Sequence, residues 1–204
     1  MTKPAMPNKP IHKPSYYMVN AITFYRLLAA PVLLTLLFND RLAVFKWLLV
    51  VSFLTDAIDG YLARRYKVTS AFGSILDSVS DDLTIAVAII GITLVNPEFL
   101  RKELVLVAIQ VLLFVTQICF ALIRYHKISS FHTYLAKFVT IFQAIFLVVF
   151  YWLPEPVYAL FYAVSALTIL DLLEEIMLVL VIPRWETDVK GLYWAIKKRA
   201  LQKA

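Results

Sequence analysis

The stretch from Asp56 to Asp81 decides how this chain folds, and it reads DAIDGYLARRYKVTSAFGSILDSVSD. Four carboxylates, those of Asp56, Asp59, Asp77 and Asp81, stand in two segments that are otherwise apolar. Within each segment the two acids are three or four residues apart, which puts them on one face of a helix. Ionised groups persist in such segments only when they are paired, bound to metal or facing a wet cavity. We therefore expect a helical hairpin in which the four acids converge on one site.

The composition of the chain indicates a membrane protein rather than a soluble one. Of its 204 residues, 61% are hydrophobic and 17% are charged, whereas soluble domains average about 45–50% and about 25%. Cys119 is the only cysteine, so the chain forms no intramolecular disulfide. The formal net charge of +6 is concentrated at the chain ends and in two loops. In a membrane protein this pattern points to orientation and anionic lipid before nucleic acid.

Apolar runs divide the chain into six candidate membrane spans between a basic arm and a basic tail. Each run approaches the roughly 20 residues that a helix needs to cross a bilayer. The arm, residues 1–17, carries four prolines and three lysines, and we expect it to be extended at the cytosolic interface. The tail, residues 184–204, is typical of an amphipathic helix on anionic lipid. We predict an all-α polytopic membrane protein whose transmembrane domain, 18–183, has spans at 21–38, 42–63, 72–95, 103–124, 133–153 and 157–182.

An even number of spans puts both termini on one side of the membrane, and the cations indicate which side. Fourteen lysines and arginines lie on the side of the termini and four lie on the other. Because cytoplasmic loops carry such an excess, we expect cytosolic termini and an acid site that opens to the cytosol. The membrane we expect is a bacterial inner membrane. The fourteen cations are Lys3, Lys9, Lys13, Arg64, Arg65, Lys67, Arg124, Lys127, Arg184, Lys190, Lys197, Lys198, Arg199 and Lys203; the four are Arg41, Lys46, Arg101 and Lys102.

The acids would form a cage of hard oxygen ligands. Mg²⁺ takes oxygen donors and usually keeps water or substrate phosphates in its shell, and two such ions held by shared carboxylates suit displacement at phosphorus. The small residues Gly60, Ala63 and Gly73 let a phosphate group approach the helices closely. Arg64 adds a fixed fork of donors for that phosphate. Because neither cysteine nor histidine stands among the acids, the pattern favours a hard cation over zinc.

These residues together resemble the signature of the CDP-alcohol phosphatidyltransferase family. The resemblance covers all eight fixed positions of the signature, Asp56-x2-Asp59-Gly60-x2-Ala63-Arg64-x8-Gly73-x3-Asp77-x3-Asp81. It implies a six-helix membrane enzyme, usually homodimeric, that displaces CMP from a CDP-linked lipid with the hydroxyl group of an acceptor alcohol. It also implies two Mg²⁺ or Mn²⁺ ions on the four acids, with Asp81 as both a ligand and the general base. The CDP pocket would be formed by Asp56, Gly60, Ala63, Arg64 and Gly73.

Two further motifs are similar to the branch of this family that contains phosphatidylglycerophosphate synthases and cardiolipin synthases. They read Asn20-x2-Thr23-x2-Arg26-x4-Pro31 and Lys137-x2-Thr140-x2-Gln143. The chain departs from that branch at Ser78, Ser80 and Asp82, where the branch usually has Pro, Ala and Lys, and at Val139, where a lysine is common. The resemblance implies CDP-diacylglycerol as the donor and glycerol 3-phosphate as the leading acceptor. Inositol, inositol phosphate and phosphatidylglycerol are the alternative acceptors.

Several polar residues in the apolar spans have two readings. We expect Arg124 and Lys137 to bind an anionic acceptor, and the alternative is that both snorkel to the interface. For the acid cluster as a whole, the alternative is a small cation- or proton-coupled transporter, which would release no CMP. No inverted repeat of the kind common in transporters is visible in the two halves of the sequence. For the acidic face formed by Asp171, Glu174 and Glu175 we expect cationic partners on another helix or a second subunit.

Overall fold

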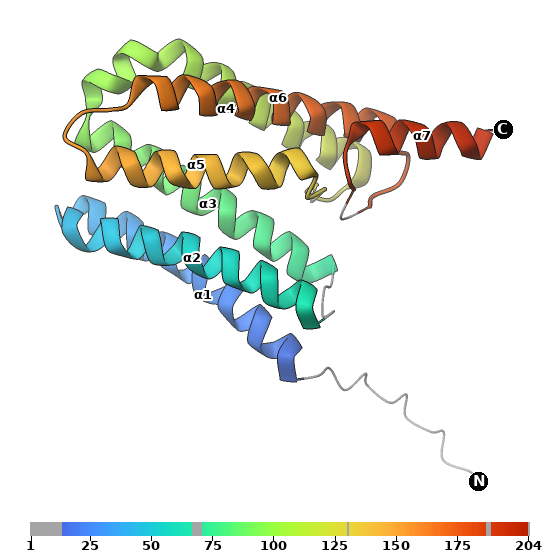
Figure 1. Ribbon diagram of the computed structural model, residues 1–204, viewed down its shortest axis with the longest axis horizontal. Coiled ribbons are helices and arrows are strands. Elements are labelled where there is room, and N and C mark those ends of the chain that lie inside the picture. The colour runs from blue at the N-terminus through green and yellow to red at the C-terminus, as the bar shows by residue number, and fades with distance from the viewer. Residues whose placement is uncertain (1–13, 67–70, 130, 187–188, 204) are drawn as a thin grey trace, which may run out of the picture.

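The structure is a computed structural model that describes residues 14–66, 71–129, 131–186 and 189–203. Within these ranges the chain forms seven α-helices and no strand (Figure 1). Residues 1–13 of the expected arm and residues 67–70 of the turn between the acid-bearing helices lie outside the described ranges. The helices are α1 (Pro14–Phe38), α2 (Leu42–Tyr66), α3 (Ala71–Val95), α4 (Pro97–Tyr125), α5 (Tyr134–Trp152), α6 (Tyr158–Val181) and α7 (Leu192–Lys203).

The all-helical prediction is confirmed, and two helix starts differ from the predicted ones. α1 begins at Pro14, so residues 14–17 are helical rather than extended, and proline is favoured in the first turn because its missing N–H has no partner there. α4 begins at Pro97 rather than at 103. The side chain of Asn96 accepts a hydrogen bond from the backbone N–H of Phe99 at 3.0 Å and caps the helix. The charged segment 97–102, which we expected to be a loop, is therefore the first turn and a half of a helix.

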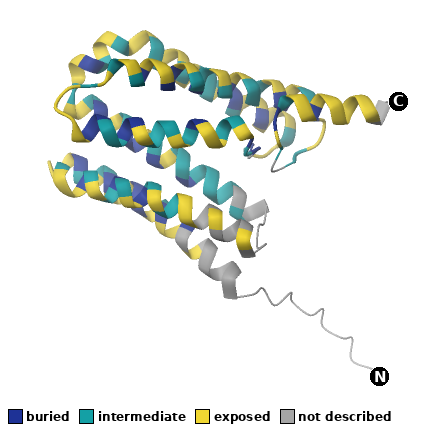
Figure 2. Ribbon diagram, in the orientation of Figure 1, coloured by how far each residue is buried: buried dark blue, intermediate teal, exposed yellow. Residues whose placement is uncertain are grey.

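Three helical segments are long and apolar enough to cross a membrane, as judged by length and composition among the described residues. They are Ile75–Val95 within α3, Pro97–Tyr125 and Tyr134–Trp152. Many residues on the outside of the bundle are exposed (Figure 2), and a large number of them are large apolar residues. On α4, Val105, Leu112 and Ile123 are 74%, 67% and 75% exposed. Large exposed apolar surfaces of this kind mark contact with lipid or with another protein, and together with the three long apolar helices they indicate membrane association.

The helices run back and forth, so that each end of the bundle collects alternate connections (Figure 1). α1 packs against α2 and α3, α4 packs against α6, and α5 contacts both α2 and α6. The main apolar core lies toward the end that holds the α1–α2 and α5–α6 connections, and includes Leu33, Phe45, Leu49, Ala88, Phe146, Phe150, Tyr151 and Phe161. The acids therefore lie in the half of the bundle that this core leaves free.

A close contact between α3 and α5 fixes this core. The Tyr151 hydroxyl group donates a hydrogen bond to the carbonyl oxygen of Ala88. A Cβ atom at Gly91 would collide with that hydroxyl group and lie 3.1 Å from both methyl carbons of Leu37. Only glycine leaves room for the tyrosine at this point, so the residue at 91 decides how closely α5 can approach α3.

A second, smaller apolar cluster docks the tail helix at the opposite end. It consists of Ala121, Phe131, Leu178, Val179, Ile182 and Ala195. The Tyr125 hydroxyl group donates a hydrogen bond to the carbonyl oxygen of Ile182 at 2.8 Å. α7 is therefore attached to the ends of α4 and α6, rather than lying apart from the bundle as the sequence alone would allow.

Candidate metal centre

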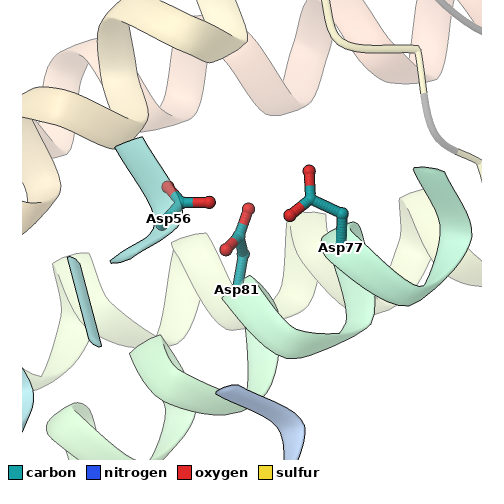
Figure 3. Close-up of side chains that lie close together, drawn as sticks. All are labelled: Asp56, Asp77 and Asp81. Atoms are coloured by element: carbon teal, nitrogen blue, oxygen red, sulfur yellow. The ribbon is translucent and has the colours of Figure 1, made fainter. Parts of the chain in front are cut away.

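Three of the four predicted acids converge between α2 and α3 (Figure 3). Asp56 comes from the second half of α2, and Asp77 and Asp81 come from the first half of α3. One carboxylate oxygen from each residue lies within 4.8 Å of the other two. The three side chains keep 24%, 26% and 23% of their surface exposed, so the group is sheltered by the bundle but still open to a ligand.

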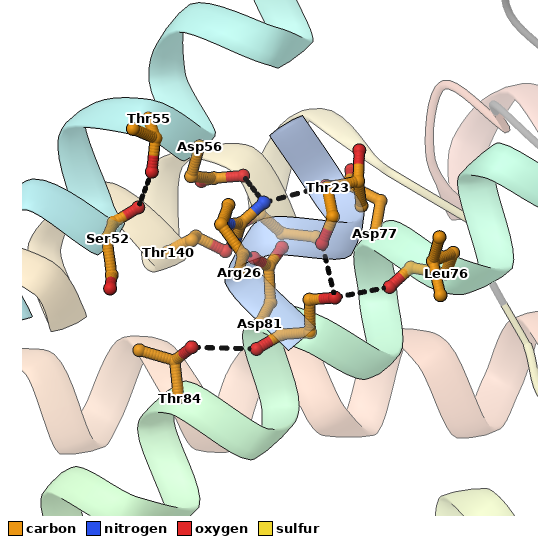
Figure 4. Close-up of polar contacts among 12 residues, drawn as sticks. Thr23, Arg26, Ser52, Thr55, Asp56, Leu76, Asp77, Asp81, Thr84 and Thr140 are labelled. Carbon is orange, nitrogen blue, oxygen red and sulfur yellow. Dashed lines mark hydrogen bonds and ion pairs between the residues drawn. The ribbon is translucent and has the colours of Figure 1, made fainter. Parts of the chain in front are cut away.

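The guanidinium group of Arg26 on α1 lies among these three carboxylates (Figure 4). Its Nη1 atom is 2.6 Å from Oδ1 of Asp56 and 3.0 Å from Oδ1 of Asp77, and its Nη2 atom contacts Asp81. The arginine side chain is only 2% exposed. Three like charges at this spacing repel one another strongly in a medium of low dielectric constant, and the planar fork of donors on one arginine relieves that repulsion at all three acids.

Small hydroxyl side chains bring α1 close enough to α3 for this contact. Ser80 is fully buried, and its hydroxyl group lies 2.8 Å from the carbonyl oxygen of Leu76 and 3.4 Å from that of Thr23 on α1. Thr84 donates to the carbonyl oxygen of Ser80 at 2.8 Å, which satisfies its own buried hydroxyl group. Because Thr23 and Arg26 are three residues apart, they share one face of α1. The close approach at Thr23 therefore places Arg26 over the acids.

The donor set fits a divalent hard cation. All three converging donors are carboxylate oxygens, which are the ligands that Mg²⁺ and Mn²⁺ prefer. Three ionised carboxylates against one guanidinium group leave a net negative charge that a divalent ion would compensate. Arg26 contacts the Oδ1 atom of all three acids, so a metal ion bound to those oxygens would compete with the arginine.

The other predicted metal and CDP-pocket residues are only partly described. The backbone of α2 continues through Asp59, Gly60, Ala63 and Arg64, but their side-chain positions lie outside the described part of the structure. Gly73 lies on α3, one turn before Asp77, and is half-buried. The structure thus brings together Asp56, Asp77 and Asp81, and it leaves the fourth acid and most of the CDP pocket as predictions.

The two predicted acceptor residues lie at the same end of the bundle as the acids (Figure 1). Arg124 is in the last turn of α4 and Lys137 is in the first turn of α5, and both side chains are exposed. The Nζ atom of Lys137 is 5.9 Å from the centre of the Tyr134 ring. One turn further along α5, Thr140 is drawn with the group around Arg26 in Figure 4. The next motif residue, Gln143, donates to Thr168 at 2.9 Å and links α5 to α6.

Two functional contacts were missed by reasoning from the sequence. Arg26 was recognised within a motif, but the acids were not identified as its partners. The signal was present, because an arginine in the middle of an apolar helix needs an acid, and the signature supplies the acids. The partner expected for Glu174 was a cation, but its Oε1 atom accepts a hydrogen bond from the backbone N–H of Leu192 at 2.9 Å. That contact holds the first turn of α7, where unpaired N–H groups favour a carboxylate.

Comparison with known proteins finds relatives that use different acceptors according to their names. The chain is 39% identical over 74 residues to a CDP-diacylglycerol–glycerol-3-phosphate 3-phosphatidyltransferase of Rickettsia bellii. The aligned region covers 35% of this chain and 41% of the relative. It is 33% identical over 91 residues to a cardiolipin synthase (CMP-forming)/mitochondrial hydrolase fusion protein of Schizosaccharomyces pombe, over 40% of this chain and 15% of the relative. It is 38% identical over 66 residues to a CDP-diacylglycerol–inositol 3-phosphatidyltransferase of Saccharomyces cerevisiae, over 32% and 30%.

These matches are partial, and the family match is broad. The chain spans less than half of the length of each of these relatives. No solved structure matches the chain. A family model described as CDP-alcohol phosphatidyltransferase matches residues 16–183, a range that contains Arg26, the three converging carboxylates and the six helices of the bundle except the first two residues of α1. The chain therefore belongs to the CDP-alcohol phosphatidyltransferase family.

Proposed function

We propose that this protein transfers a phosphatidyl group from CDP-diacylglycerol to an acceptor alcohol and releases CMP. The observation that carries the proposal is the convergence of Asp56, Asp77 and Asp81 within a chain of the CDP-alcohol phosphatidyltransferase family. Glycerol 3-phosphate is the leading acceptor, which would make the product phosphatidylglycerophosphate. The name of the Rickettsia bellii relative supports it. Inositol or inositol phosphate is the alternative, supported by the name of the Saccharomyces cerevisiae relative. Phosphatidylglycerol is a further alternative.

In the mechanism we propose, the four acids would hold the metal ions, and Asp81 would also accept the proton of the acceptor alcohol. Asp56, Asp59, Asp77 and Asp81 would hold two Mg²⁺ or Mn²⁺ ions, whose chemistry is to neutralise the diphosphate and stabilise the leaving CMP. Asp81 accepts the proton of the acceptor hydroxyl group, and the oxygen of that hydroxyl group forms a bond to the lipid-linked phosphorus. The bond from that phosphorus to the CMP oxygen breaks in the same displacement. Gly60, Ala63, Arg64 and Gly73 would line the pocket for the CDP group.

Arg26 has a positioning role in this scheme. Its guanidinium group keeps the three carboxylates together when no divalent cation is bound, because it compensates their mutual repulsion. If a metal ion were held by these carboxylates, Arg26 would give up some of its contacts with them, and its guanidinium donors would then be available at the site. The site is thereby assembled before substrate arrives.

We further propose that the six helices of the bundle all span a bacterial inner membrane, with cytosolic termini. The arrangement of the helices supports this, since the first residues of α1 and the whole of α7 lie at the same end of the bundle as the acids (Figure 1). Described lysines and arginines, among them Arg124, Lys127, Arg184 and Lys190, are at that end too. The homodimer implied by the family resemblance is part of the proposal, and a sedimentation mass of one protomer in detergent would count against it.

Removal of divalent cations should abolish CMP release from CDP-diacylglycerol and glycerol 3-phosphate, and Mg²⁺ or Mn²⁺ should restore it, because the acids are the only proposed metal ligands. Purified protein in detergent, assayed for radiolabelled CMP and lipid product, provides the measurement. Asp81→Asn should lose turnover while it keeps its affinity for the CDP-lipid. Full activity in chelator would disprove the metal-dependent reaction, and no CMP release under any condition would favour a transporter.

The substitution Arg26→Met should lower the stability of the metal-free protein by about 1–3 kcal/mol, because three partly buried carboxylates lose their counter-charge. Added Mg²⁺ should raise the melting temperature of this variant more than that of the wild type, since the ion no longer competes with the guanidinium group. Thermal unfolding in detergent, with chelator and with Mg²⁺, measures both effects. Arg41→Met is the matched control, because Arg41 is exposed in the α1–α2 turn. An unchanged metal response in Arg26→Met would contradict the competition.

Substitution of either Arg124 or Lys137 by Ala should raise the KM for glycerol 3-phosphate about ten- to a hundredfold, since a contact with a charged group contributes about 1.5–3 kcal/mol. The KM for CDP-diacylglycerol should change little. Lys127→Ala is the control, because Lys127 is an exposed cation of the connection between α4 and α5, and its Nζ lies 4.9 Å from the centre of the Trp185 ring. Equal effects on both substrates would make Arg124 and Lys137 structural. A wild type that does not use glycerol 3-phosphate would favour the alternative acceptors.

Cysteines introduced as Lys9→Cys and Lys203→Cys should react with an impermeant maleimide only in broken cells, whereas Glu155→Cys should react in intact ones. The experiment needs a Cys119→Ser background, because the native cysteine is exposed, and removal of any outer-membrane barrier. Six spans and cytosolic termini require this pattern. Labelling of the two terminal positions on opposite faces would mean an odd number of spans.

A further inference from the structure

A cavity of about 470 Å³ lies between the end of α6 and the inner face of α7. Four cations line it, namely Arg184, Lys190, Lys198 and Arg199, together with Glu186 and Trp194. The acid cluster contributes no residue to its walls. Most of the lining lies beyond residue 183, where the match to the family model ends. The cavity is therefore a feature added to the catalytic bundle.

Polar contacts hold the walls of this cavity in place. Arg199 donates to the carbonyl oxygen of Val181 at 3.1 Å, which ties α7 to the end of α6. Glu174 accepts from the first turn of α7, as described above. The backbone N–H of Val189 donates to the carbonyl oxygen of Phe131 at 2.7 Å, which ties the α6–α7 connection to the α4–α5 connection. The walls come from two helices and a connection that are bonded to one another, so the cavity is preformed.

The charge of the lining favours an anion. Lys198 forms an ion pair with Glu186 at 2.9 Å, which leaves Arg184, Lys190 and Arg199 as the excess positive charge around the cavity. Asp188 of the connection lies outside the described residues. Guanidinium and ammonium groups in this combination bind phosphate oxygens well, because the first offers a planar pair of donors and the second a compact charge.

The surroundings of the cavity are apolar, which selects a lipid over a soluble anion. On the side of α7 that faces away from the cavity, Tyr193 and Ile196 are 67% and 50% exposed, and Leu201 near the end of the helix is 71% exposed. Trp194 lies at the rim, with its ring in an edge contact with Tyr134 at 5.7 Å between ring centres. A helix with an apolar outer side, flanking cations and aromatic residues lies in the headgroup region of a bilayer.

We propose that this cavity binds the phosphate headgroup of an anionic phospholipid, with the acyl chains lying along the outer side of α7. The site is separate from the one that carries out phosphatidyl transfer, and the proposal stands whether or not the proposed function is correct. The bound lipid would fix the tail helix to an anionic membrane surface at the acid-bearing end of the bundle.

Native mass spectrometry of the purified protein with added phosphatidylglycerol, and with phosphatidylcholine of the same acyl chains, tests the proposal. The wild type should retain phosphatidylglycerol in preference to phosphatidylcholine. Arg184→Gln and Lys190→Gln should each weaken that binding about fivefold, which corresponds to the loss of one cation close to an anionic headgroup. Lys197→Gln is the matched control, because Lys197 is an exposed cation of α7 that does not line the cavity.

Three results would overturn the proposal. Unchanged binding in Arg184→Gln and Lys190→Gln would place the lipid elsewhere, including at the acids. An equal loss in Lys197→Gln would reduce the effect to the general charge of the tail. Displacement of the lipid by an excess of inorganic phosphate would make the cavity a site for soluble anions. The melting curve of each variant, followed by circular dichroism, should match that of the wild type, because the substituted side chains are exposed.

Discussion

Placing three carboxylates within 4.8 Å of one another in an apolar bundle requires a compensating positive charge. In this protein the charge comes from Arg26, which is almost wholly buried against the acids. The arrangement depends on α1 lying close to α3, and that closeness depends on small hydroxyl residues such as Ser80. A larger side chain at 80 would move α1 outward and separate the arginine from its partners. The charge of the acids is therefore compensated only if small residues let α1 and α3 pack closely.

One half of the bundle contributes most of the stability, and the other half holds the charged site. The half that contains Phe45, Phe150 and Phe161 is packed with large apolar side chains and a tyrosine bound to a helix backbone. The half that contains the acids is packed with serine, threonine and arginine, and it is the more exposed of the two around Asp56 and Asp77. Stability comes mainly from the first half, since burial of apolar surface is the main favourable term. The second half can then hold charged and partly solvated groups, which a site for a diphosphate needs.

The sequence predicts the helices and the convergence of the acids well, because both depend on local spacing. The four-residue interval puts Asp77 and Asp81 on one face of α3, and Asp56 comes from α2, the preceding helix in the chain. The role of Arg26 does not follow in the same way, because its partners are 30 to 55 residues away and their contact depends on how α1 packs against α3. The start of α4 was misplaced because charged residues in a first turn resemble a loop when the capping contact of Asn96 is unknown. The docking of α7 depends on Glu174 and on a small apolar cluster, neither of which has a sequence pattern of its own.

The position of Arg26 also bears on how the protein enters the membrane during synthesis. Arg26 is the central residue of α1, and an arginine at the centre of an inserting helix costs about 2.5–3.5 kcal/mol on the translocon scale. Its partners on α3 are made 51 and 55 residues later. In the proposed six-span topology, Asp56 of α2 supplies the first counter-charge, and the two acids of α3 follow only when that helix arrives beside α1. The first three helices would then leave the translocon as a group, and the acid cluster would assemble as part of insertion rather than after it.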